Sequence, residues 1–155
     1  MKNLALFFSF FILAIQVEAQ ALLSSPSNKS KVVVVTLDSI APADAYRLTS
    51  QLFIDAGYDL EKTDEALLLL STGWGEKKGF WQVQLALSAN VRASGSGSQV
   101  RLSGQWRQPN TSADAKAMLG GDFSTSDIEK RTNGGKYWQA LEDMAALLGG
   151  RVQYF

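Results

Sequence analysis

The chain has 155 residues, and its 15 basic and 15 acidic residues leave it without net charge. A neutral chain has no electrostatic reason to bind nucleic acid or an anionic membrane surface. Histidine and cysteine are both absent, which excludes a Ser-His-Asp triad, a Cys-His pair and any zinc or copper site built on histidine.

Residues 1–19 have the pattern of a signal peptide. An apolar run from Leu4 to Ile15 is followed by small residues that end at Ala19, where we expect a signal peptidase to cleave. The run is too short for the roughly 20 apolar residues of a membrane-spanning helix. We therefore expect a secreted or periplasmic protein that is not inserted into a membrane after cleavage. The rest of the chain should form a flexible lead-in over residues 20–30 and a single α+β domain over residues 31–155.

The domain is expected to begin with a strand and a helix. Residues Val32 to Leu37 are mostly apolar and β-branched, which predicts a strand covered on both faces. Pro42 at the first helical position and Gly57 as a left-handed stop delimit a helix. Apolar residues at helical spacing predict its buried stripe: Ala45, Leu48, Leu52, Phe53 and Ala56.

A charged segment and a second apolar segment follow. A short strand could begin at Tyr58 to Leu60, and the mostly charged residues 62–65 predict a solvated turn. The segment from Ala66 to Thr72, with leucines at positions 67–70, predicts another strand with both faces covered. Trp74 lies between two glycines in the polar connection that comes next.

Residues 81–107 predict a long β-hairpin, because its two arms alternate apolar and polar residues in phase. The odd positions of the first arm and the even positions of the second are apolar or small, so each arm has one buried face. The turn is expected within Gly95 to Ser98. The expected facing pairs are Ala93 with Val100, Val91 with Leu102, Ala89 with Gly104, and Leu87 with Trp106. The third pair is small and would leave a saddle that a helix can cross closely.

Signals are weak from Pro109 to Gly135 and strong again afterwards. The weak stretch predicts mostly loop, with two helical turns over Ala113 to Leu119. A broad apolar stripe predicts a final helix over Lys136 to Leu148, which Gly149 ends. Residues 151–155 are expected to return as a short edge strand.

This order of elements predicts a two-layer α+β sandwich. A curved, mainly antiparallel sheet of four to six strands would carry both helices on one face, since each helix has one apolar stripe to bury. In outline the arrangement resembles the helix-grip and similar split α+β domains that are common in bacterial envelope proteins.

Two groups of oxygen-bearing side chains are candidates for chemistry. The acids within residues 55–65 could supply a general acid and base or hold a hard cation, but their spacing matches no calcium loop. A looser group between Asp122 and Glu129 also departs from the EF-hand order, and calcium binding there is the alternative to a polar loop. We assign no catalytic residue, metal site or cofactor.

Aromatic and apolar residues predict two candidate binding regions. If the sheet does not close on the last helix, a pocket for a small apolar ligand would lie between the hairpin and that helix; otherwise the same residues pack the core. The residues concerned are Leu85, Leu87, Trp106, Tyr137 and Trp138. A protein partner would instead contact an exposed tryptophan and the long loop. These candidates are Trp74, Met118, Leu119 and Phe123.

The strands with two apolar faces need cover on the side that the helices leave open. The long loop, with Ile128 among its apolar residues, could fold across that side. Otherwise the sheet face would dock another protein or a second copy in a homodimer.

The leading hypothesis is an exported, non-enzymatic domain that binds a protein partner in the cell envelope or outside the cell. The alternatives are a carrier of a small apolar ligand and a carboxylate-based hydrolase. A continuous internal cavity would favour the carrier, whereas two carboxylates converging in a cleft would favour the hydrolase.

Overall fold

The computed structural model of the chain describes residues 29–76, 83–109, 123–130 and 135–155. The signal peptide predicted over residues 1–19 lies outside these ranges. Trp81 and the helical turns expected over Ala113 to Leu119 also lie outside them.

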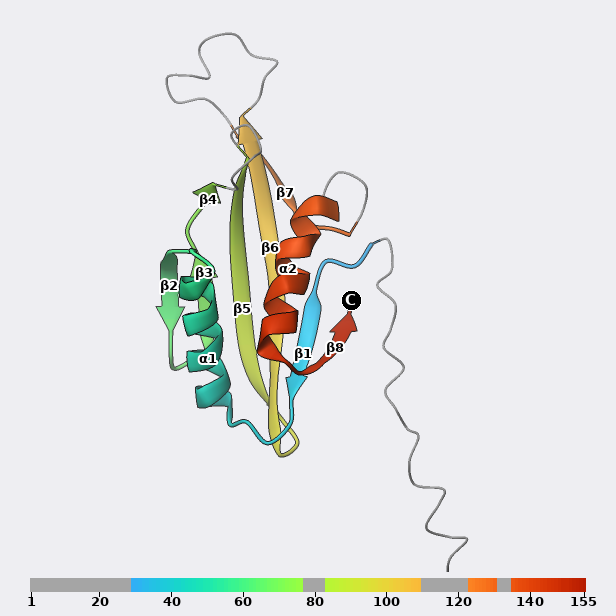
Figure 1. Ribbon diagram of the computed structural model, residues 1–155. Helices are drawn as coiled ribbons and strands as arrows, with labels where there is room; N and C mark the ends of the chain where they lie inside the picture. The colour runs from blue at the N-terminus through green and yellow to red at the C-terminus, as the bar shows by residue number, and fades with distance from the viewer. Residues whose placement is uncertain (1–28, 77–82, 110–122, 131–134) are drawn as a thin grey trace, which may run out of the picture.

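An open antiparallel sheet with two helices makes up the described fold (Figure 1). Its elements are β1 (Val33–Leu37), α1 (Pro42–Asp55), β2 (Leu60–Asp64), β3 (Leu69–Thr72), β4 (Gly75–Glu76), β5 (Gln84–Ser94), β6 (Gly97–Pro109), β7 (Phe123–Asp127), α2 (Gly135–Leu148) and β8 (Arg151–Tyr154). The strand order is β2-β3-β5-β6-β1-β8, while β4 pairs with β5 and β7 pairs with β6. Every pairing among the described strands is antiparallel.

The α+β class and the mainly antiparallel sheet are therefore confirmed, but the sheet has more strands than the four to six expected. Two strands that the sequence predicted only in part or not at all are polar. β2 includes Leu60, where a short strand was expected, but it continues through the segment predicted as a charged turn, and β7 lies in the stretch with weak signals. Glu, Lys and Asp are depleted in strands, so composition concealed β2, which pairs with β3 at the edge of the sheet.

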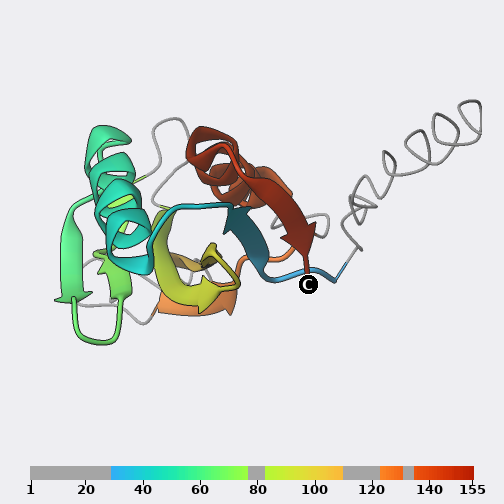
Figure 2. The same cartoon turned by 90° about the horizontal axis from the view of Figure 1, so that it is seen from below.

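Both helices pack on the same face of the sheet (Figure 2). α1 contacts β5 and β6, α2 contacts β1 and β6, and the two helices contact each other. The apolar core lies between the two layers and includes Val33, Val35, Phe53, Leu85, Leu87, Val100, Leu102, Trp138 and Leu141. Neither helix within the described ranges is long and apolar enough to cross a bilayer.

α1 has its predicted limits but not all of its predicted stripe. Leu48 is 37% exposed, whereas Tyr46 and Thr49 are buried. Thr49 can be buried because its hydroxyl donates a hydrogen bond to the carbonyl oxygen of Ala45 at 2.7 Å, which satisfies its polar atom. Periodicity among apolar residues alone therefore placed the buried face slightly out of position.

α2 packs against the hairpin, as the sequence predicts, and also against the last strand. The ring of Tyr137 lies 5.3 Å from that of Trp106 on β6, measured between centroids. The ring of Trp138 lies 6.1 Å from that of Tyr154 on β8. These contacts join the C-terminal helix to two strands of the core, and β8 forms the predicted edge strand.

The β5–β6 hairpin is in phase as predicted but two residues away from the expected register. Its turn is Gly95-Ser96, and Val91 faces Val100 rather than Leu102. Gly95 has a φ of +58°, whereas the φ of Ser96 is not positive. A glycine with positive φ at the first of the two turn positions is typical of a type II′ turn. A shift of two residues leaves every inward side chain on the inside, so alternation alone does not distinguish the two registers.

The predicted saddle is also wrong. Gly104 faces Leu87 instead of Ala89, and the side chain of Ile128, rather than a helix, lies above it. Ile128 is fully buried, and its N–H donates to the carbonyl oxygen of Gly104 at 2.9 Å. Ile128 therefore belongs to the core on the helix side and does not cover the opposite face.

The sequence predicts that two strands, β1 and β3, are covered on both faces. The structure confirms this for β1 only. On β1 the outward-facing Val34 is only 7% exposed. On β3 Leu70 is buried, but Leu69 is 40% exposed, and Leu67 in the preceding turn is 63% exposed. Apolar surface on the helix-free side is therefore concentrated at the β2–β3 hairpin.

Candidate binding groove on the helix-free face

The sheet face that points away from both helices carries mostly polar side chains. Successive strand residues point to opposite faces, so the positions between the buried ones make up this outer face. On β5 these positions are Gln84, Ala86, Ser88, Asn90 and Arg92, and on β6 they are Gln99, Arg101, Ser103, Gln105 and Arg107. The predicted outward direction of the polar residues in both arms is confirmed.

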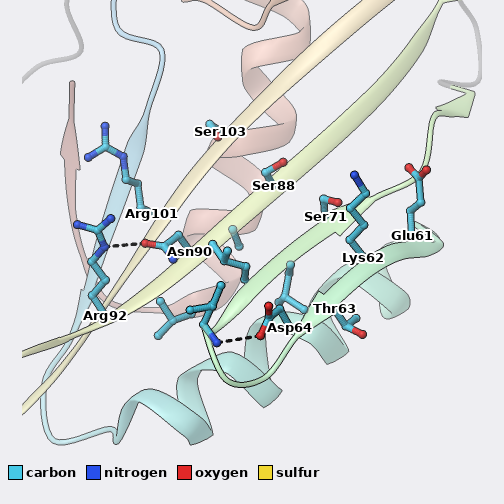
Figure 3. Close-up of a pocket in the computed structure, with 15 residues that line it drawn as sticks. Glu61, Lys62, Thr63, Asp64, Ser71, Ser88, Asn90, Arg92, Arg101 and Ser103 are labelled. Carbon is cyan, nitrogen blue, oxygen red and sulfur yellow. Dashed lines mark hydrogen bonds between the residues drawn. The ribbon is translucent and has the colours of Figure 1, made fainter.

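Over β2, β3, β5 and β6 the outer face is hollowed into a groove of about 1130 Å³, which we call the sheet-face groove (Figure 3). Ligand sites in proteins commonly enclose about 300–1,000 Å³, so a ligand or a segment of a partner fits the available space. The groove is lined by Glu61, Lys62, Thr63, Asp64, Leu67, Leu69, Leu70, Ser71, Ser88, Ala89, Asn90, Val91, Arg92, Arg101 and Ser103.

Three serines line one border of the groove. Ser71 faces Ser88, and Ser88 faces Ser103, so β3, β5 and β6 each contribute one serine to a row across the strands (Figure 3). Serine side chains are short, which leaves space above the sheet. Each hydroxyl can donate and accept hydrogen bonds, so the row can bind the polar groups of a ligand.

Two arginines and an asparagine lie on one side of the groove. Arg101 faces Asn90 in the register, and the Nε of Arg92 donates a hydrogen bond to Oδ1 of Asn90 at 2.7 Å (Figure 3). This bond orients Arg92 through its Nε, and the two terminal amino groups of Arg92 take no part in it. Within the described part of the chain, neither arginine forms an ion pair.

The β2–β3 hairpin forms the other side. Between the exposed side chains of Leu67 and Leu69, Leu68 has a φ of +52°, a conformation that costs an L-residue about 1–2 kcal/mol. Two hydrogen bonds hold this turn: Asp64 Oδ1 accepts from the N–H of Leu67 at 2.9 Å, and the N–H of Val91 donates to the carbonyl of Leu68 at 3.0 Å. Backbone strain of this kind is concentrated at functional sites.

A smaller hollow of about 450 Å³ adjoins the groove and shares two of its serines. There Lys31 Nζ lies 3.0 Å from Glu129 Oε1 and 3.1 Å from Asp127 Oδ2. Hydrogen bonds to Glu129 and then to Asp127 raise the pKa of Lys31. Hydrogen bonds from Lys31 and then from Gln105 lower the pKa of Asp127. The charges in this hollow are therefore already paired.

Trp74, a predicted partner-binding residue, lies against the outer face near the start of β5. The guanidinium carbon of Arg107 is 4.3 Å from the centroid of its ring, a cation–π contact. Arg107 Nε also donates to Oε1 of Gln84 at 2.6 Å. Trp74 is half-buried by this arrangement, and its contact with a partner stays a prediction.

The five residues predicted to line an apolar pocket come together between the hairpin and α2. Four of them, Leu85, Leu87, Tyr137 and Trp138, are buried, and Trp106 is half-buried against the same core. None of the five lines the sheet-face groove or the smaller hollow. A ligand pocket among them stays a prediction.

The remaining predicted site residues are placed less fully. Met118 and Leu119 lie outside the described ranges, and of Phe123 only the backbone is described, at the start of β7. The acids within residues 55–65 lie partly on strand β2, and no group of three or more acidic side chains in the described ranges could hold a metal ion.

Sequence reasoning placed Arg92, Arg101 and the hairpin serines on one face but did not identify a groove. The missing information is that β3 lies beside β5 and brings Ser71, Leu69 and β2 next to the hairpin.

In comparisons with known proteins, no model of a known protein family matches the sequence, and no curated protein matches it significantly.

Proposed function

We propose that this protein is an exported binding domain without catalytic activity, and that the sheet-face groove holds a segment of a protein partner. The observation that carries the proposal is a hollow of about 1130 Å³ on the face of the sheet that the two described helices leave open. Most of its lining side chains project from paired strands, which hold a binding geometry more rigidly than loops do.

Export is proposed from the signal-peptide pattern of residues 1–19, which gives a secreted or periplasmic location. The likeness to helix-grip domains belongs to the same proposal. It is supported by the long β5–β6 hairpin and by α2, which lies across β6 and β1 (Figure 1).

A non-catalytic role is proposed from the residue types available. The chain contains no histidine and no cysteine. The carboxylates that line the groove, Glu61 and Asp64, both come from the exposed edge strand β2. Asp64 already accepts a backbone hydrogen bond from Leu67.

Site-specific crosslinking tests the proposal sharply, because a chain without cysteine can be labelled at one introduced thiol. Ser88→Cys, Ser103→Cys and Lys62→Cys each place a benzophenone maleimide at a residue that lines the groove. Gln139→Cys, at an exposed position of α2, is the matched control. The full-length coding sequence is expressed, and the labelled protein is irradiated in an extract of the cells that produce it.

We expect one partner protein to be crosslinked from the three groove positions and not from position 139. Crosslinking only through Gln139→Cys would contradict the proposal, as would the absence of a crosslinked protein at every position. Thermal unfolding of each labelled variant shows whether the fold is retained.

A further inference from the structure

We infer that the segment held in the sheet-face groove is an acidic peptide that also carries an apolar side chain, an inference that rests on the proposed function. Its carboxylate binds between Arg92 and Arg101. Its apolar side chain packs on Leu67 and Leu69 at the other side of the groove.

The first argument is the charge of the two arginines. Arg101 faces Asn90, and Arg92 is two residues further along β5, so their side chains are diagonal neighbours on one face. Within the described ranges, no acid forms an ion pair with either of them. Asp64 is in the same row as Arg101, but three strand spacings separate them, which is about 14 Å. This distance exceeds the screening length of about 8 Å in physiological salt, so Asp64 does not compensate the charge of Arg101. An anion between the arginines would relieve their repulsion.

The second argument is the set of hydrogen-bond donors that the arginines leave available. The Nε of Arg92 is bonded to Oδ1 of Asn90, so the terminal amino groups of Arg92 and the amide nitrogen of Asn90 remain to donate. The guanidinium of Arg101 lies on the same side of the groove (Figure 3). Guanidinium groups bind carboxylates with two parallel hydrogen bonds, so this side of the groove suits a carboxylate.

The third argument is the distance between the polar and apolar sides. Leu69, Asn90 and Arg101 occupy one row across β3, β5 and β6, and two strand spacings span about 10 Å. An extended peptide covers that distance in about three residues. The exposed Leu67 and Leu69 provide apolar surface at the far end. The serines of the neighbouring row provide partners for the backbone of the peptide.

The adjoining hollow shows why the anion site is expected at the arginines. Lys31 there is already bound to Asp127 and Glu129, so its charge is compensated within the chain. A ligand carboxylate would have to displace one of these acids, whereas none is in place at Arg92 or Arg101 within the described ranges.

A selection of random peptides displayed on phage, with the protein expressed from its full coding sequence as target, tests the inference. We expect enriched peptides to carry Asp or Glu about three positions from a large apolar residue. Arg101→Gln should weaken the binding of a synthetic enriched peptide by about ten- to a hundredfold, and Arg101→Lys by less, because it keeps the charge without the guanidinium fork. Arg47→Gln, at an exposed position of α1, is the charge control and should leave binding unchanged.

The outcomes separate the inference from the proposed function. Peptides without acids that no longer bind once Ser88→Cys carries a bulky label would overturn the inference and support the groove as a binding site. Enriched peptides that are insensitive to that label would overturn both. Binding that is weakened equally by Arg47→Gln and Arg101→Gln would overturn the inference, because nonspecific charge would then account for it.

Discussion

Gly104 on β6 faces Leu87 on β5, and a Cβ atom added to Gly104 would lie 2.8 Å from Cδ1 of Ile128 and 2.9 Å from Cδ2 of Leu87. The missing side chain therefore makes room for Ile128, which follows β7 in the chain. Ile128 also donates its N–H to the carbonyl of Gly104. Through this contact a polar strand with weak sequence signals is joined to the core.

Gly104→Ala should accordingly destabilise the protein. Neither Ile128 nor Leu87 can move far inside the core, so we expect a loss of about 1–3 kcal/mol in the free energy of unfolding, typical of overpacking. Urea unfolding followed by circular dichroism measures it. Ser103→Ala, the adjacent outward position, should change stability by less than about 0.5 kcal/mol. Equal stabilities of the two variants would contradict the packing described.

The hairpin turn gives a second prediction. Gly95 has a φ of +58°, so Gly95→Ala should cost about 1–2 kcal/mol, the penalty for an L-residue in the left-handed region. Ser96→Ala at the other turn position is the control and should cost less. If the two substitutions proved equally costly in thermal unfolding, the turn would not be Gly95-Ser96.

The same turn shows how far sequence reasoning reached. The alternation of both arms predicted which side chains point inward, and that is confirmed. It did not identify the turn, because glycine occurs at both position 95 and position 97 and either could belong to a two-residue turn. The two glycines are required for different reasons. Gly95 needs a positive φ, whereas a Cβ on Gly97 would clash with the carbonyl oxygen of Leu37 on β1. That contact is set by tertiary structure and leaves no local signal.

The groove illustrates the same limit. The outward direction of Arg101 and Ser103 follows from a period of two along one strand, and the sequence predicts it. The position of β3 beside β5 and of β1 beside β6 is a matter of chain topology. Most of strand β2 was predicted as a turn because its charged residues have low strand propensity, although pairing with β3 holds it in the sheet.

The ion pairs of Lys31 predict how stability depends on pH. The pKa of Asp127 is lowered in the folded state, so its contribution is present above the unfolded-state value of about 4 and is lost as the pH falls through the folded-state value. Asp127→Asn should therefore flatten the acid limb of a plot of unfolding midpoint against pH. Ser126→Ala, at the neighbouring exposed position of β7, removes no titrating group, and as the control it should leave that limb unchanged. An unaltered acid limb in Asp127→Asn would contradict the assignment.

The four tyrosines predict the alkaline limb. Burial raises the pKa of Tyr46, Tyr58, Tyr137 and Tyr154, since desolvation disfavours the phenolate. A raised folded-state pKa gives stability that is fully present below the unfolded value of about 10 and is lost as the pH rises through the folded-state values.

Tyrosinate absorbance in the ultraviolet should therefore appear at higher pH for the folded protein than for the protein in urea, and unfolding should accompany it. Tyr46→Phe should make the unfolding free energy fall less steeply with pH above that point, because one proton no longer differs between the two states. Lys31→Ala is the control for the absorbance measurement. The pKa of Lys31 is also raised, but lysine does not absorb in this range, so the tyrosinate titration curve should stay unchanged. Coincident titration curves in buffer and in urea would show that the tyrosines are not buried as described.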